Sequence, residues 1–303
     1  MRKTLRIPVI FHRAFLRAVD HDCFNLAQSA AYSAMVSLFP ALIVAAAIIA
    51  LLPDTAPIRS QLGAFFDRIL PSDVTPLLES YFNTSPHNPK STHALILAFL
   101  VSFTGASSVI ATFMEGLRRA HHLPPNCWTF WDRRGRAYAL VPLSLVPLAI
   151  ASSLVVFGHI ITAWLAMHVI PSVRTPVYII ALIIRWTVAL TGSVGLIALI
   201  YHMGTPIRQP WRRTLPGAIA ATAMWFLTTL AFGWYVTRFA NYSQVYGSLG
   251  AGVALLFWLY IISLSVLCGA EFNVQFRAHF HGDFLPRIHP HSTASAPNEP
   301  PPG

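Results

Sequence analysis

The stretch VYIIALIIRWTVALTGSVGLIALIY, residues 177–201, is made of apolar or small residues along almost its whole length, with one cation, Arg185, near its middle. A helix of about 20 residues, rising 1.5 Å per residue, crosses the roughly 30 Å hydrocarbon core of a bilayer. This stretch is therefore long enough to form a membrane-spanning helix. The 303-residue chain is 55% hydrophobic and only 11% charged, whereas a soluble domain has roughly 25% charged residues. The composition predicts an integral membrane protein.

Five further stretches have the same apolar character, and we place them near residues 31–52, 94–114, 138–162, 215–236 and 248–270. Together with residues 177–201 they predict an all-α polytopic membrane protein with six transmembrane helices. We expect three parts: a basic N-terminal interfacial segment (1–30), a membrane domain (31–276) and a polar tail (277–303). The tail is rich in proline beyond residue 288 and is expected to be disordered.

The basic residues predict the orientation of these helices, because cytoplasmic loops are enriched in Lys and Arg. Fifteen of the 21 Lys and Arg residues fall in the N-terminal segment, the second and fourth loops and the tail. The alternate loops carry five, namely Arg59, Arg68, Lys90, Arg174 and Arg238. We therefore expect both termini in the cytoplasm and the protein in a bacterial inner membrane. Topology also explains the net charge of +10, so no nucleic-acid partner is expected.

Two segments outside the spans have an amphipathic pattern. Residues 58–69 place apolar side chains at helical spacing, and residues 1–20 mix apolar and basic side chains. Both patterns are typical of helices that lie in a membrane interface, and basic ones favour an anionic leaflet. The expected partner is thus the lipid bilayer, with anionic lipids as candidates.

The sequence also contains segments that resemble a known family. They are YSQVYGSLGAGVALLFWLY (242–260), GAEFN (269–273), FNLAQSAAYSAMVSLFPALIV (24–44) and TFWDRRGRAYAL (129–140). The chain resembles the YihY/BrkB family of bacterial inner-membrane proteins over most of residues 20–276. This resemblance implies a six-helix membrane protein. Some members have carried a ribonuclease label and others a virulence label, and neither implies an established activity.

Arg185 needs an explanation, because an arginine at a helix centre costs about 2.5–3.5 kcal/mol on insertion scales. Ala181, Ala189 and Gly192 share its helical face, and small residues allow another helix to approach. We therefore expect Arg185 to face protein, although its long side chain could also reach the headgroups.

The start of the last span is the predicted partner of Arg185, because glycines and free N–H groups at a helix start suit an anion. The candidate anion or substrate site consists of Arg185, Gly247, Ser248, Gly250 and Arg238. The alternative is structural: the glycines serve close helix packing, and the arginine binds backbone carbonyls.

Polar side chains also line two helices that we expect to be buried in the membrane. They form a candidate polar passage: Asn25, Ser29, Tyr32, Ser33, Ser37, Thr104 and Ser108. Small hydroxyl residues are equally common where membrane helices pack together, so both interpretations stay open.

Acidic residues offer little sign of catalysis. Glu115 has Arg118 and Arg119 three and four positions later, a spacing that predicts a structural ion pair, and Glu271 lies near the predicted cytoplasmic surface. Hydrolysis of RNA needs clustered carboxylates or a positioned acid and base, and the sequence has no such array. We expect no enzyme activity, no cofactor and no metal site.

Two functions remain. The favoured one is transport or handling of an anionic lipid or solute, and the alternative is a non-transporting envelope scaffold or assembly partner.

Overall fold

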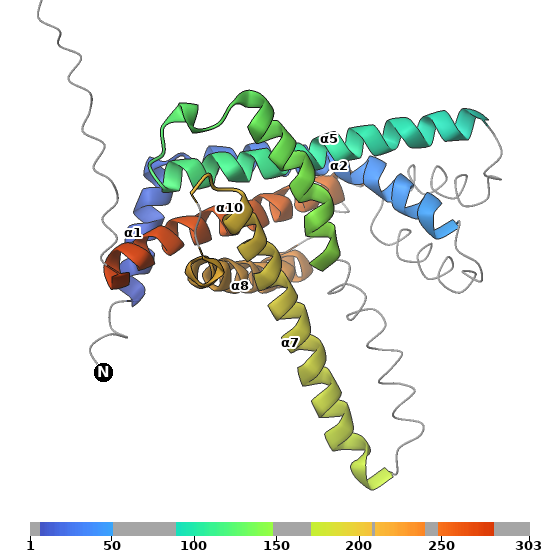
Figure 1. Cartoon of the computed structure of the whole chain (residues 1–303). Helices are drawn as coiled ribbons and strands as arrows, with labels where there is room; N and C mark the ends of the chain where they lie inside the picture. The colour runs from blue at the N-terminus through green and yellow to red at the C-terminus, as the bar shows by residue number, and fades with distance from the viewer. Residues whose placement is uncertain (1–6, 51–88, 148–170, 208–209, 240–247, 282–303) are drawn as a thin grey trace, which may run out of the picture.

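The computed structural model describes residues 7–50, 89–147, 171–207, 210–239 and 248–281, which form helices and connecting turns. A helix covers residues 130–147. The other elements, in chain order, are α1 (Ile7–Asp20), α2 (Cys23–Ala50), α5 (Pro89–Ala120), the short 3₁₀ helix η2 (Pro125–Cys127), α7 (Pro171–Met203), the 3₁₀ helix η3 (Trp211–Arg213), α8 (Leu215–Phe239) and α10 (Ser248–His281). Figure 1 shows a helical bundle from which the first half of α7 diverges.

Five helices in the described part of the chain are long and apolar enough to cross a membrane. Their spans are Cys23–Ala45, Thr92–Ala120, Tyr178–Met203, Leu215–Tyr235 and Gly252–Phe280. They correspond to five of the six predicted spans, so the prediction of a polytopic, all-helical membrane protein is confirmed. The remaining predicted span, 138–162, is helical over 138–147. Its second half, the interfacial helix predicted at 58–69 and the tail beyond residue 281 lie outside the described residues.

Two boundaries differ from the prediction. The first span begins at Cys23, within the segment 1–30 that the sequence assigns to the interface, and α10 continues to His281. The early start follows from a tight turn: Asp22 adopts φ 59°, and the amides of His21 and Asp22 bond to the carbonyls of Arg17 and Val19. A left-handed residue of this kind ends one helix and allows the next to begin at once.

One end of the bundle gathers most of the described cations and is named the basic end here. It comprises α1, the turn at residues 21–22, the last turn of α5, residues 121–136 with the first turns of the helix 130–147, residues 204–207 and 210–214, and the last turns of α10, which lie toward one end of the bundle in Figure 1. The arginines in these parts are Arg13, Arg17, Arg118, Arg119, Arg133, Arg134, Arg136, Arg212, Arg213 and Arg277. α1 packs against α10 through Ile10 and Ala14, one helical turn apart.

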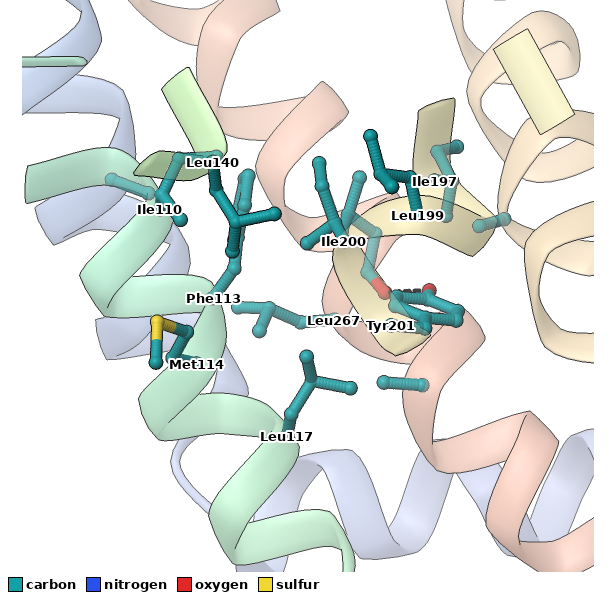
Figure 2. Close-up of a cluster of buried hydrophobic side chains, with 14 of the residues drawn as sticks. Ile110, Phe113, Met114, Leu117, Leu140, Ile197, Leu199, Ile200, Tyr201 and Leu267 are labelled. Carbon is teal, nitrogen blue, oxygen red and sulfur yellow. Dashed lines mark hydrogen bonds between the residues drawn. The ribbon is translucent and has the colours of Figure 1, made fainter. Parts of the chain in front are cut away.

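The main apolar core lies next to the basic end. Figure 2 shows side chains from α5, the helix 130–147, α7 and α10 meeting there. Met114, Leu117, Leu140 and Leu267 are among the most deeply buried. Because each comes from a long helix at or beside the basic end, this core fixes how those helices cross.

Close helix crossings are made by small residues. A Cβ added to Gly105 of α5 would overlap Ser37 of α2, and one added to Gly217 of α8 would overlap Asn273 of α10. Gly269 of α10 faces Gly217 and Ala221 of α8 in the same crossing. Such contacts bring backbones close together, which is how membrane helices gain packing energy in the absence of a hydrophobic driving force.

Candidate functional site at the basic end

A buried acid–histidine pair lies at the basic end. His21, in the turn between α1 and α2, donates from Nδ1 to Oε1 of Glu271 over 2.7 Å. The Glu271 side chain is 1% exposed and that of His21 is 14% exposed. A buried carboxylate is stable only with hydrogen-bonded partners, so this contact links the end of α10 to the start of α2.

The second carboxylate oxygen of Glu271, Oε2, has different surroundings from Oε1. Oε2 is fully buried and has no hydrogen-bond partner among the described residues. A buried polar atom without a partner is unusual and often marks a functional position. Within the described part of the chain, the pair therefore has one acceptor that no donor satisfies.

Two further histidines, His121 and His122, form the turn that follows α5. His122, in the turn after α5, lies edge-on to the His21 ring with centroids 4.9 Å apart. His121 is buried and donates from Nδ1 to the carbonyl of Leu117. Burial lowers the pKa of His121 to about 4, and it also lowers the pKa of His122 below its ordinary value. Both rings therefore favour the neutral form near pH 7.

An arginine network holds the turn that carries His21. Glu115 of α5 accepts hydrogen bonds from Arg118 over 2.6 Å and from Arg119 over 3.1 Å, and Arg133 lies 3.6 Å away. Arg119 also donates to the backbone oxygen of His21 over 3.2 Å. The predicted pairing of Glu115 with Arg118 and Arg119 is confirmed, and it ties α5 to the α1–α2 turn.

The GAEFN segment gains a structural explanation. Gly269 allows α8 to approach, Glu271 faces His21, and Asn273 accepts a hydrogen bond from the amide of Gly217 over 3.1 Å. The last bond satisfies an N–H in the first turn of α8, which no helical carbonyl can reach. This short segment of α10 thus contacts both the α1–α2 turn and the start of α8.

A pocket of about 560 Å³ lies between the helix 130–147 and the end of α7 with the residues that follow it. Its polar groups are Arg136, His202 and Thr205, and its remaining walls are apolar. The guanidinium of Arg136 lies 4.2 Å from the ring centre of Trp128. The His202 ring stacks on Trp211, and its buried Nδ1 has no hydrogen-bond partner among the described residues.

The residues of the predicted anion site lie on three helices. Arg185 is half-buried in the first half of α7, Arg238 is exposed in the last turn of α8, and Gly250 is buried near the start of α10. Ser248 is the first residue of α10, and Gly247 lies outside the described residues. The described contacts do not test whether these residues form one site, which stays a prediction.

The predicted polar passage divides into two groups. Asn25, Ser29, Tyr32 and Thr104 are exposed on the bundle surface. Ser33, Ser37 and Ser108 lie against other helices or bond within their own: Ser37 donates to the carbonyl of Ala34, and Ser108 to that of Thr104. The Ser108 hydroxyl also accepts a hydrogen bond from Arg134 over 3.4 Å. A passage along these residues stays a prediction.

The sequence argument missed the pairing of Glu271 with His21. The two residues are 250 positions apart, so no local pattern connects them. The sequence nevertheless contained one sign of this site, which is the presence of Glu271. Glu271 lies in a long apolar segment, where a charged side chain is costly and marks a candidate functional site.

The fold and this site define a polytopic membrane protein with a buried acid–histidine pair at its basic end. The family described as Virulence factor BrkB matches residues 14–290, and the chain belongs to this family, which includes the YihY and UPF0761 proteins. The resemblance seen in the sequence is thereby confirmed.

Several bacterial relatives align with most of the chain. The putative ribonuclease-like protein YfkH of Bacillus subtilis is 27% identical over 267 residues, which cover 86% of this chain and 92% of the relative. A UPF0761 membrane protein of Tolumonas auensis is 28% identical, covering 87% and 84% of the two chains. One of Nitrosospira multiformis is 25% identical over 88% of this chain but 61% of its own length. No solved structure matches the chain significantly.

Proposed function

We propose that this protein transports or handles an anionic lipid or solute at the bacterial inner membrane, with the basic end and both termini in the cytoplasm. The observation that carries the proposal is the pocket beside Arg136 and His202. The arginines of the basic end support this orientation, because cytoplasmic loops are enriched in basic residues.

The lining of the pocket suits an anion with an apolar part. Arg136 offers a planar set of donors that fits phosphate or carboxylate oxygens. His202, whose ring stacks on Trp211, adds a second polar side chain to the lining. The lining also includes the apolar side chains of Leu140, Met203 and Ile207. A lipid headgroup with its first carbons would meet both kinds of surface.

The scaffold alternative is supported by the apolar core beside the pocket. Side chains from α5, the helix 130–147, α7 and α10 pack together there, as a purely structural bundle requires. In that case Arg136 would serve packing through its contact with Trp128. The scaffold predicts no selective retention of anions.

We propose that the protein does not hydrolyse RNA, although the name of the Bacillus subtilis relative includes the term ribonuclease-like. The two glutamates of the basic end are engaged: Glu115 by three arginines, and Glu271 by His21 in a buried site. Neither carboxylate is open to activate water or to hold a metal ion against a phosphate.

Native mass spectrometry of the purified protein tests the pocket with phosphatidylglycerol as the probe and phosphatidylcholine as the neutral comparison. Arg136→Gln is expected to lose about ten-fold in retained phosphatidylglycerol, while Arg136→Lys keeps part of it. Arg212→Gln is the control, because Arg212 is exposed at the same end but does not line the pocket. Equal retention by Arg136→Gln and the wild type would exclude this pocket as the anion site.

A second measurement separates transport from scaffolding. Fluorescent phosphatidylglycerol is placed in reconstituted vesicles, and its movement between leaflets is followed by chemical quenching from outside. The wild type should move the probe faster than empty vesicles, and Arg136→Gln should slow it. Arg185→Leu, measured in parallel, tests the anion site predicted on α7. Retention of the lipid without movement would favour the scaffold.

A further inference from the structure

We propose that Glu271 and His21 form a proton-binding site that couples proton uptake to movement of the anion. The coupling rests on the proposed transport function, whereas the proton site itself does not. The geometry that carries it is a buried carboxylate with one oxygen bonded to a histidine and the other without a hydrogen-bond partner among the described residues.

The two side chains are arranged in order of depth. His21 is 14% exposed at the basic end, whereas Glu271 is 1% exposed. His122 lies edge-on to His21 and is partly exposed as well. A proton from water at the basic end can therefore reach the imidazole first, pass to Oε1 over 2.7 Å, and leave Oε2 as the innermost acceptor. Relays of acidic and histidine side chains of this kind carry protons in membrane transporters.

Charge balance explains why separation of the pair would move a proton. With one shared proton the pair is neutral, and a neutral pair is the state that a dry interior tolerates. If the end of α10 moves away from the α1–α2 turn, Glu271 must keep a proton, because a lone buried carboxylate is too costly. His21, which is partly exposed at the basic end, is then free to accept a second proton. The separated state therefore binds one proton more in mild acid.

The surroundings leave His21 as the partner that neutralises Glu271. The charged and titratable groups around the pair, from every element packed on it, are Arg17, Asp22, Cys23, Glu115, Arg119, His122, Tyr201 and Cys268. The nearest cation on α5, Arg119, bonds to Glu115, Asp22 and the His21 backbone. Among the described residues, His21 is the hydrogen-bond partner of the Glu271 carboxylate.

Infrared difference spectroscopy of the full chain in vesicles of phosphatidylethanolamine and phosphatidylglycerol tests the proton site directly. A step from about pH 7.5 to about pH 5.5 spans the ordinary pKa of histidine. The wild type should gain the carbonyl band of a protonated, buried carboxylic acid, and Glu271→Gln should lose this band. Glu115→Gln is the matched control and should retain it, because Glu115 is bound by arginines. A band that persists in Glu271→Gln would overturn the proposal.

A second variant keeps the test decisive if Glu271→Gln does not fold. His21→Leu removes the donor at the more exposed member of the pair. Glu271, left buried and alone, should then carry its proton already at about pH 7.5, so the carbonyl band is present before the step and no longer changes with it. A band that still rises with acid in His21→Leu would show that His21 plays no part.

The coupling is read from the vesicle assay with fluorescent phosphatidylglycerol. Movement by the wild type should rise several-fold between about pH 7.5 and about pH 5.5 and become independent of pH in Glu271→Gln. Movement without any pH dependence would overturn the coupling and leave the transport function standing. A carboxyl band without movement of the probe would support the proton site but overturn both the coupling and the proposed transport.

Discussion

The two halves of α7 lie in different surroundings. In the second half, Ile197, Ile200 and Tyr201 are buried in the core of the basic end, as Figure 2 shows. In the first half, Ile183 and Trp186 are more than half exposed. One continuous helix is thus held by protein at one end and presents apolar side chains outward at the other. The folded core of the described bundle is therefore concentrated at the basic end, next to the polar pairs.

The largest expected effect comes from the same substitution in each half. Ile200→Ala should lower the free energy of unfolding by about 2–5 kcal/mol, because it removes buried methyl groups and leaves a cavity. Ile183→Ala should change it by less than about 0.5 kcal/mol, because Ile183 is 58% exposed. Denaturation in mixed detergent micelles measures both. An equally large loss in Ile183→Ala would show that the first half of α7 packs against a second copy or another partner.

The next largest expected effect is a change of stability with pH, and its source is His121 at the basic end. The pKa of His121 is about 4 in the folded protein and 6.5 ordinarily, so the unfolded chain binds more protons between these values. The free energy of unfolding should therefore fall as pH is lowered from about 6.5 to about 4, by at most about 3 kcal/mol.

Two variants sharpen this pH test. His121→Gln retains a donor for the Leu117 carbonyl but cannot titrate, so it should flatten part of the profile. Ile183→Ala should keep the full wild-type slope, because the first half of α7 contains no histidine. A slope unchanged in His121→Gln would assign the effect to other groups.

A smaller effect is expected from two glycines. In Gly269→Ala, the new Cβ would overlap Tyr201, Ala221 and the backbone of Gly217, so stability should fall by about 1–3 kcal/mol. Gly195→Ala on α7 meets open space and should gain up to about 1 kcal/mol from helix propensity. Thermal unfolding of the two variants gives the comparison. A neutral Gly269→Ala would mean that α8 and α10 can shift apart at no cost.

The sequence predicted the helices well because a membrane span depends on local apolar length. The starts of α8 and α10 agree with the predicted 215 and 248. The same local logic predicted the ion pair of Glu115 with Arg118 and Arg119, since residues three and four apart share a helix face.

The candidate site was less accessible to the same reasoning. The contact of His21 with Glu271 depends on how α10 crosses α2, and the pocket at Arg136 depends on where α7 ends beside the helix 130–147. Neither arrangement follows from local periodicity. The early start of α2 was also missed. The polar segment DHDC (20–23) has the composition of a loop, but the structure folds it into a tight turn, so α2 begins directly after it.

The smallest expected effect again compares the two halves of α7, now through a single hydroxyl group. Tyr201 donates a hydrogen bond to the carbonyl of Val266 in α10, which Figure 2 shows as a dashed line. Tyr201→Phe should cost about 1 kcal/mol, because the ring still fills the core and the carbonyl lies within a continuous helix. Tyr178→Phe, where the side chain is 54% exposed, should be neutral in the same unfolding assay. Equal effects in both would show that the hydroxyl of Tyr201 adds nothing, and that apolar packing alone joins α7 to α10.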